Sequence, residues 1–247
     1  MFVHEHHRRI LRVLNALRAD FFRAVGASFG GGTLLAMRYG EYRWSKDIDF
    51  LCPVGDGYRQ LRAAIMDDGL HALFAVTEGL DFPRDIKADQ YGVRFPVRVD
   101  DVIIKFEIVA EARIAFNPPD RMDWTELPCL DFTDSCAEKL LANADRWNDS
   151  SVESRDLIDL GMLRLQGALP QAAFDKAEAA YRVRQPLVNA LSAFAARPQY
   201  RQACFEALRI TRRALVLDGL DLLCADNGLP GFVREDAEKT ADWWLPS

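Results

Sequence analysis

A glycine-rich turn is followed, 14 to 16 residues later, by two aspartates that are separated by a single residue. The turn is Gly30-Gly31-Gly32-Thr33, and the aspartates are Asp47 and Asp49. A Gly-Gly-Thr turn that opens into a helix presents backbone N–H groups and a hydroxyl at the positive end of the helix dipole, which suits a phosphate. The alternative is an ordinary helix start with Thr33 as its N-cap, because glycine-rich turns alone are weak evidence.

The two aspartates are expected on one face of a strand. Residues two apart in a strand project from the same face, about 6.6–6.8 Å apart. Neighbouring carboxylates repel each other unless a cation lies between them. Mg²⁺ usually takes one or two carboxylates and completes its shell with substrate phosphates. Asp47 and Asp49 therefore predict a magnesium site, against the alternative of a polar strand face in water.

A third acid, Glu107, lies in a run of alternating polar and apolar residues. Lys105 and Glu107 share the face opposite Ile104, Phe106 and Ile108. If this strand lies beside the aspartate strand, Glu107 completes a three-carboxylate cluster of the kind that two-metal phosphoryl transfer requires. The alternative is a Lys/Glu pair on an exposed face.

Hydrophobic spacing predicts an α+β front half and an all-helical back half, with the boundary near Pro128. Helices are expected over residues 6–25, 33–40 and 57–70, a strand over 47–51, and hairpin-paired strands between 72 and 110. In the back half, helices are expected over 134–147, 154–166, 171–184, 186–196, 199–217 and 231–242. The predicted domains are residues 1–130 and 131–247.

Composition narrows the class of protein. The chain has 247 residues, 49% hydrophobic and 28% charged, which is typical of a globular protein with a sizeable core. No apolar run approaches the roughly 20 residues of a membrane span, and no secretory signal is evident. Five scattered cysteines without a CxxC pair favour a reduced, cytoplasmic setting. His4, His6 and His7 are interpreted as a solvated helix start.

The net charge and its distribution indicate what kind of partner the protein could bind. A net charge of -6 argues against nucleic acid, since a binding face is usually basic. Residues 182–213, however, contain seven arginines and one acid, Glu206. This arginine segment could bind phosphates on an otherwise acidic protein. The alternative is an arginine-rich helical exterior.

The residues together resemble a known family. One segment resembles the first motif of the nucleotidyltransferase toxins of the abortive-infection (AbiEii) type, which belong to the DNA-polymerase-β-like nucleotidyltransferase superfamily. The matching residues are Gly31-Gly32-Thr33, Leu35-Ala36, Tyr39, Arg43, Ser45 and Asp47-Ile48-Asp49-Phe50. The strand of the third carboxylate resembles Lys105-Phe106-Glu107-Ile108. The downstream helical motifs resemble residues 137–142, Arg146 and residues 155–160. These segments occur in the family's order over residues 29–160.

The resemblance implies a polymerase-β-like mixed sheet with flanking helices, followed by an all-helical C-terminal domain. It implies a Mg²⁺-dependent enzyme that moves a nucleotidyl group from an NTP to an acceptor. In toxin members the acceptor is a tRNA 3′ end, and a protein antitoxin is the usual partner. The implied nucleotide-binding residues are Gly31, Gly32 and Thr33 for phosphates, Arg43 as a phosphate clamp, and Ser45. The implied metal and catalytic residues are Asp47 and Asp49 on metal, Glu107 as metal ligand or base, Lys139 on phosphate, and Asp156 in the downstream acidic motif.

Two departures from the family and three alternatives stay open. The third acid is glutamate rather than the aspartate of many superfamily members, and no motif is recognised beyond Asp159. The acceptor could be a small molecule, although the arginine segment favours RNA. A degenerate member could bind only a partner protein or a nucleotide. A DxD glycosyltransferase is disfavoured by the downstream matches and by the lack of a nucleotide-sugar Rossmann pattern.

Overall fold

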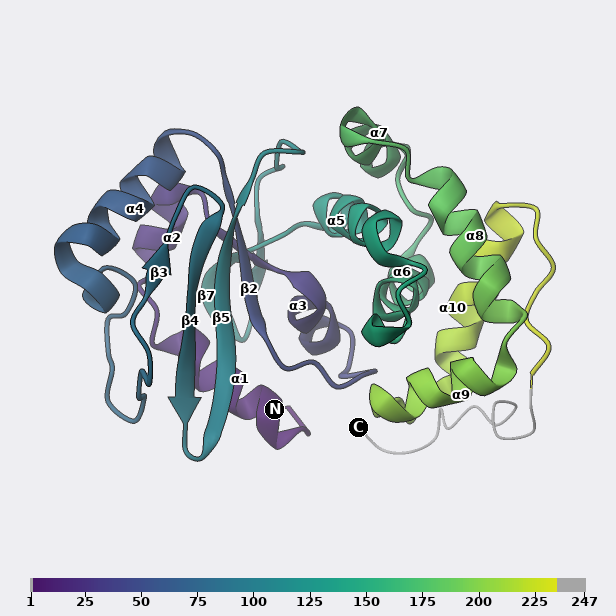
Figure 1. The fold of residues 1–247 in the computed structure, drawn as a ribbon, viewed down its shortest axis with the longest axis horizontal. Coiled ribbons are helices and arrows are strands. Elements are labelled where there is room, and N and C mark those ends of the chain that lie inside the picture. Colours follow the sequence, from purple (N-terminus) through teal and green to yellow (C-terminus); the bar gives the residue numbers. More distant parts are fainter. Residues whose placement is uncertain (1, 235–247) are drawn as a thin grey trace. The chain divides into compact units, whose positions relative to one another are not determined.

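The computed structural model describes residues 2–234, which form two compact units (Figure 1). The first unit runs to Glu41 and resumes at Ser45, ending at Asp131. The second unit contains Tyr42–Trp44 and the residues from Phe132 onward. The three-residue segment Tyr42–Trp44 is therefore separated in sequence from the rest of its unit, a feature that no sequence pattern indicated.

The first unit is built on one seven-stranded mixed sheet. Its strand order is β3-β4-β5-β2-β1-β7-β6. The strands β2/β5 and β1/β7 pair in parallel, and the other neighbours pair antiparallel. The strand bounds are β1 Ser28–Gly30, β2 Ile48–Pro53, β3 Lys87–Ala88, β4 Gly92–Val99, β5 Val102–Glu111, β6 Asp120–Met122 and β7 Thr125–Cys129.

The buried face of the sheet explains the alternation in the sequence. Phe50 of β2 and Phe106 of β5 are fully buried, and their ring centroids lie 5.6 Å apart. Phe22 and Phe29 also pack on the Phe50 ring. Because side chains alternate along a strand, the polar neighbours of these phenylalanines must point to the opposite face of the sheet.

Four helices and a short 3₁₀ helix belong to the described part of the first unit: α1 Glu5–Asn15, α2 Ala19–Val25, α3 Gly31–Arg38, α4 Asp56–Asp68 and the 3₁₀ helix η1 Gly69–Ala72. The prediction of one helix over 6–25 is wrong, because the chain leaves the helix after Asn15. Arg18 donates its backbone N–H to Leu73, and Ala75 donates to Ala16. Tertiary backbone hydrogen bonds therefore replace the helical ones at this break.

The sequence pattern did not predict the short strands. β1, β6 and β7 have three, three and five residues, too few for a clear period-two signal. Conversely, the residues around Phe74 alternate as in a strand, but Phe74 forms only an isolated bridge with Leu17. The hairpin of β4 and β5 has the predicted extent.

The second unit is helical in its described part. Its elements are α5 Phe132–Arg146, the 3₁₀ helix η2 Ser150–Val152, α6 Arg155–Gln166, α7 Gln171–Ala180, α8 Arg184–Ala195, α9 Pro198–Ala207 and α10 Arg213–Asp226. The single helix predicted over 199–217 is in fact α9 and the start of α10, separated at Arg209, whose φ is 52°. The helix predicted over 231–242 lies mostly outside the described residues. Among residues 2–234, no helix has both the length and the hydropathy of a membrane span.

Candidate active site

Three acids lie on or next to two adjacent central strands of the sheet in the first unit, near the start of β2; we call Asp47, Asp49 and Glu107 the carboxylate edge. Asp49 of β2 lies in register with Glu107 of the parallel strand β5. On its other side Asp49 is paired with Gly30 of β1. Asp47 directly precedes β2. The expected adjacency of the third acid to the aspartate strand is therefore observed, and all three acids are partly exposed.

Gly31 is the point where the glycine turn contacts the carboxylate edge. Its φ is +68°, in the left-handed region that favours glycine. A Cβ added to Gly31 would lie 2.8 Å from Oδ2 of Asp49. The next residues form the first turn of α3, which has no side-chain N-cap hydrogen bond. The sequence thus places the first-turn N–H groups of a helix, which suit anions, directly beside an acid that would bind metal.

Thr33 and Ser45 lie together beneath this turn. Thr33 is 1% exposed, and its Oγ1 donates to the backbone carbonyl of Asp47 at 2.5 Å. Oγ of Ser45 lies 2.8 Å from Oγ1 of Thr33. These hydroxyls fix the chain that leads into Asp47. A phosphate contact at Thr33 would therefore come from its backbone N–H, and the predicted phosphate roles of Gly31, Gly32 and Thr33 stay predictions.

His7, on α1, holds the loop that leads into Asp47. It is fully buried, with Nδ1 2.6 Å from Oε1 of Glu41 and Nε2 3.1 Å from the carbonyl of Ser45. Burial lowers the pKa of His7, against the opposing effect of Glu41. The interpretation of this histidine as part of a solvated helix start is wrong, because its ring fills a buried position between Glu41 and Ser45.

Two cations hold the third acid. Nε of Arg94 on β4 donates to Oε1 of Glu107 at 2.6 Å, and Lys105 forms an ion pair with the other oxygen. Burial would raise the pKa of Glu107, but the hydrogen bonds from Lys105 and Arg94 outweigh it and lower that pKa. Burial acts to lower the pKa of Lys105, whereas Glu107, Asp49 and Asp47 together raise it. Arg94 was missed from the sequence because its register against Glu107 cannot be obtained from alternation alone.

The carboxylate edge has the donor chemistry that Mg²⁺ prefers, namely carboxylate oxygens on adjacent strands. Within the described residues, however, no three His, Cys, Asp or Glu side chains converge on one point that could hold a metal ion. Glu107 is turned toward Arg94 and Lys105 instead. Asp47 and Asp49 thus fit a site of two carboxylates whose shell substrate phosphates would complete.

In the second unit, the predicted residues Arg43, Lys139 and Asp156 are joined by Arg146 and Asp159, and we call these five side chains the buried ion network. Arg43 donates to both oxygens of Asp159, at 2.6 and 2.8 Å. Lys139 donates to Asp156 at 3.0 Å and lies 2.7 Å from Asp159. Arg146 forms two hydrogen bonds with Asp156, at 2.6 and 3.0 Å. The hydroxyl of Tyr42 donates to Asp159 at 2.6 Å.

Most of this network is inaccessible to water. Arg43 is 3% exposed and Asp159 is fully buried. Burial would raise the pKa of Asp159, but Arg43 and Lys139 outweigh it and lower that pKa. Lys139 and Arg146 likewise hold the pKa of Asp156 far below its usual range despite burial. Three cations and two carboxylates leave one positive charge among the five side chains, and Arg146 is the member most open to solvent.

Only part of the arginine segment is exposed on the surface. Arg201 is fully buried, which removes one of its seven guanidinium groups from any phosphate-binding face. The exposed members include Arg184, Arg197 and Arg209, and each of these stacks on an aromatic ring. Part of the segment is therefore an arginine-rich helical exterior, and phosphate binding by this segment stays a prediction.

The chain is similar to two crystal structures from Helicobacter pylori. The crystal structure of JHP933 from Helicobacter pylori is 18% identical, covers 90% of each chain and superposes with a TM-score of 0.52, which shows a shared fold. A second H. pylori crystal structure, described as that of a candidate nucleotidyltransferase, is 18% identical over 87% of this chain and 89% of its own, with a TM-score of 0.49. No curated protein matches the chain.

A family model for the nucleotidyl transferase AbiEii toxin of type IV toxin–antitoxin systems matches residues 12–218, which is most of the chain. The match confirms the resemblance that the motifs indicated, and with it the predicted fold class and the enzyme class of nucleotidyltransferase. The chain belongs to the AbiEii nucleotidyltransferase toxin family.

Proposed function

We propose that the protein uses Mg²⁺ to transfer a nucleotidyl group from an NTP to the 3′ end of a tRNA, as the toxin of a toxin–antitoxin pair. The observation that carries the proposal is the register of Asp49 with Glu107, with Gly31 and the start of α3 against Asp49. An acceptor hydroxyl would attack the α-phosphorus, the bond to the β,γ-diphosphate would break, and pyrophosphate would leave.

In the first unit, the backbone N–H groups of Gly32 and Thr33 would bind the triphosphate. Asp47 and Asp49 would hold Mg²⁺, which supplies charge neutralisation at the transferring phosphoryl group. Glu107 would act as a further ligand or would take the proton of the acceptor hydroxyl. Its pairing with Lys105 and Arg94 keeps this carboxylate fixed beside Asp49 until substrate arrives.

In the second unit, Lys139 and Arg146 would contact phosphate. The excess positive charge of the buried ion network supports this role, as does the partial exposure of Arg146. Asp156 would orient both cations, since it accepts hydrogen bonds from each. We assign Arg43 to holding Asp159 in place, because its Nε and Nη2 groups are both used there.

An RNA acceptor is favoured by the exposed arginines of the second unit, whose planar groups suit phosphate contacts. A small-molecule acceptor is the alternative. An antitoxin partner is expected from the type IV toxin–antitoxin family, and the cytoplasm is the compartment in which NTPs, Mg²⁺ and tRNA occur together.

The test is transfer of label from each of four α-³²P NTPs, with Mg²⁺, onto total tRNA, beside Asp49→Ala. Label on tRNA with the wild type alone is expected, and the most efficient NTP identifies the donor. Omission of Mg²⁺ should abolish the label. RNA transfer should also fall steeply with salt, because phosphate contacts release counterions.

Other outcomes would redirect the assignment. Folded protein that binds Mg-NTP but labels no RNA would favour the small-molecule acceptor. Protein that binds no NTP would favour a partner-binding role. Expression toxicity that persists in Asp49→Ala would contradict the catalytic role of this acid.

A further inference from the structure

Glu41 has a backbone conformation that calls for an explanation. Its φ is 53°, in the left-handed region that favours glycine. Residues other than glycine persist in that region only where their surroundings hold them, and they cluster at functional sites. A glutamate at this position is therefore explained by what its side chain contacts, because its backbone alone would favour a glycine.

Three donors converge on the Glu41 carboxylate. The backbone N–H groups of Val3 and His4 donate to its two oxygens, and Nδ1 of His7 lies 2.6 Å from Oε1. The side chains of His7 and Glu41 are 0% and 8% exposed. Burial would raise the pKa of Glu41, but the hydrogen bonds outweigh it and lower that pKa. Glu41 is therefore an ionised anchor for the start of α1.

The other ring nitrogen of His7 reaches the loop that precedes β2. Nε2 lies 3.1 Å from the carbonyl oxygen and 3.3 Å from the backbone nitrogen of Ser45. Nδ1 carries a proton, since an ionised carboxylate only accepts hydrogen bonds. The neutral ring then accepts the Ser45 N–H at Nε2, and the protonated ring donates to the Ser45 carbonyl, so either form holds this residue. His6 adds a contact between its Nε2 and the carbonyl oxygen of Lys46, at 3.0 Å.

The contacts of His7 lead to a predicted metal ligand. Ser45 is two residues before Asp47, and its hydroxyl meets that of Thr33, which donates to the backbone carbonyl of Asp47. Asp47 directly precedes β2, so the placement of this acid depends on the loop as well as on the sheet. The family match begins at residue 12, so no family motif indicated a role for His7.

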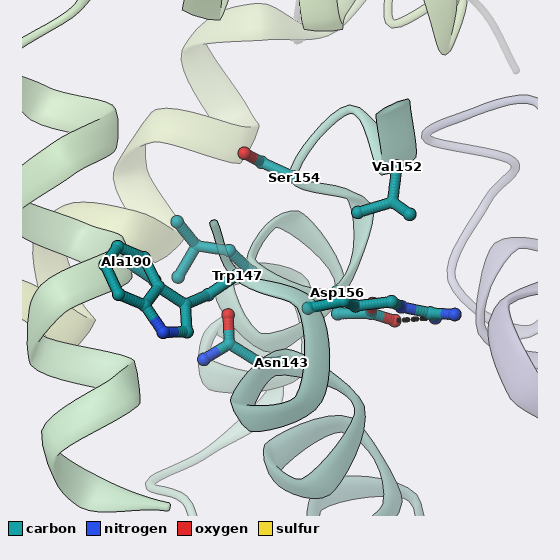
Figure 2. Close-up of a pocket in the computed structure, with 8 residues that line it drawn as sticks. Asn143, Trp147, Val152, Ser154, Asp156 and Ala190 are labelled. Carbon is teal, nitrogen blue, oxygen red and sulfur yellow. Dashed lines mark hydrogen bonds and ion pairs between the residues drawn. The ribbon is translucent and has the colours of Figure 1, made fainter. Parts of the chain in front are cut away.

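The cavity beside Asp156 in the second unit is too small for the metal and its substrate. Figure 2 shows it, with Asn143, Trp147 and Ser154 also in its lining. It has room for about one water molecule, which is too little for a nucleotide with its metal ion. The partly exposed acids of the first unit are therefore the better candidates for the metal, and the contacts that order them bear on activity.

We infer that His7, held by Glu41, is a positioning residue that orders the loop so that Asp47 is in place before Mg²⁺ binds. The inference rests on the proposed function for the metal role of Asp47. His7 acts on Ser45 rather than on metal or substrate, so its loss should weaken metal binding more than it slows transfer at saturating Mg²⁺. A merely structural histidine would instead lower the amount of folded protein and leave the KM for Mg²⁺ unchanged.

The experiment measures binding of Mn²⁺, a spectroscopic substitute for Mg²⁺, by electron paramagnetic resonance on the full-length protein without nucleotide. Side-chain amides donate hydrogen bonds, and the amide nitrogen lies at the place of Nδ1 in asparagine and of Nε2 in glutamine. His7→Asn therefore keeps the bond to Glu41 but loses Ser45, and Mn²⁺ should bind about tenfold more weakly. His7→Gln should restore most of the affinity. In the transfer assay, His7→Asn should raise the KM for Mg²⁺ with a smaller change in kcat.

Glu41→Gly keeps the test decisive where a histidine variant folds poorly. Glycine suits the left-handed backbone at this position and removes the carboxylate, so the chain should fold while the Mn²⁺ affinity still falls. Asp49→Ala should bind Mn²⁺ least. The matched controls are His71→Asn and His71→Gln, at an exposed histidine of the same unit, and both should bind Mn²⁺ as the wild type does. Thermal melting checks the folding of every variant.

Unchanged Mn²⁺ affinity and unchanged KM for Mg²⁺ in folded His7→Asn and Glu41→Gly would overturn the inference, and so would a wild type that binds no Mn²⁺. Equal losses in His7→Asn and His7→Gln that follow only the folded fraction would reduce His7 to a structural residue. Mn²⁺ binding that depends on His7, without any transfer by the wild type, would refute the proposed function and leave the positioning role standing.

Discussion

The two units treat their charged residues in opposite ways. At the carboxylate edge of the first unit, Asp47 and Asp49 are partly exposed, and the backbone is shaped around them by Gly31. In the buried ion network of the second unit, Asp159 is fully buried between Arg43, Lys139 and the Tyr42 hydroxyl. The acids of the carboxylate edge are partly open to solvent, whereas both carboxylates of the buried ion network are buried and form ion pairs within it.

The difference separates two kinds of functional contribution. Partly solvated acids gain little folding stability from each other, because like charges repel, which agrees with the proposal that Asp47 and Asp49 serve binding and chemistry. Buried and fully bonded ions fix geometry, because removal of one partner leaves an uncompensated charge. Substitution of an acid should therefore affect mainly activity at the carboxylate edge and mainly folding in the buried ion network.

The largest effect on activity is expected for Asp49→Asn. The amide keeps the size of the side chain but loses the charge that would bind Mg²⁺, so the rate of nucleotidyl transfer should fall by about 10²–10³-fold. The melting temperature should change little. Asp101→Asn, at an exposed acid in the β4–β5 turn, is the matched control and should keep full activity. A large drop in stability with normal activity in the Asp49→Asn variant would contradict the distinction between the clusters.

The largest effect on folding is expected for Asp159→Asn. Loss of this carboxylate leaves Arg43 and Lys139 buried beside a neutral group, which should lower the free energy of unfolding by about 3–5 kcal/mol. Chemical denaturation followed by circular dichroism measures the change.

The chain offers a close control for this second prediction. Arg164 also makes two hydrogen bonds to one aspartate, Asp226, at 2.6 and 3.1 Å, but this pair lies near the surface. Asp226→Asn should therefore cost less than about 1 kcal/mol. Equal effects of the two substitutions would mean that burial does not distinguish these ion pairs.

The sequence predicted the carboxylate edge better than the ion network. Alternation around Phe50 and Phe106 indicates which side chains face the core, so Asp49 and Glu107 could be assigned to the opposite face. The network depends on the long-range contact of Arg43 with Asp159, 116 positions away, which no local period encodes. The fold class followed from periodicity and from the family motifs, whereas the break at Asn15 and the short strands depend on tertiary hydrogen bonds.

A smaller effect is expected for Gly31→Ala. The left-handed φ of +68° costs an alanine about 1–2 kcal/mol, and the added Cβ would also push against Oδ2 of Asp49. Nucleotidyl transfer should fall more than the stability loss explains, because the metal-binding acid is displaced. Gly167→Ala, at a position with an extended backbone and nothing within 4 Å of an added Cβ, should be neutral. A fall in stability with unchanged transfer would show that Asp49 tolerates the displacement.

The smallest effect is expected for the change in the free energy of unfolding on mild acidification. The pKa values of Asp156, Asp159 and Glu107 are all lowered in the folded protein. Between pH 7 and pH 5 these acids stay ionised in both states, so they should add no pH dependence to unfolding. Below the unfolded pKa values of about 4, the unfolded chain binds protons first, and stability falls by about 1.4 kcal/mol per pH unit for each such acid.

Chemical denaturation at a series of pH values measures this dependence of stability on pH. The variant Asp159→Asn gives a more specific test. The variant lacks one buried carboxylate with a lowered pKa, so its stability should fall less steeply below pH 4 than that of the wild type. Asp226→Asn again provides the comparison, because its partner lies near the surface. A gain of stability between pH 7 and pH 5 would mean that these acids take up protons in the folded state, because the folded chain would then bind more protons than the unfolded chain; it would contradict an ion network held by its ion pairs. A loss of stability in the same window is the expected contribution of His7, whose pKa is lowered by burial.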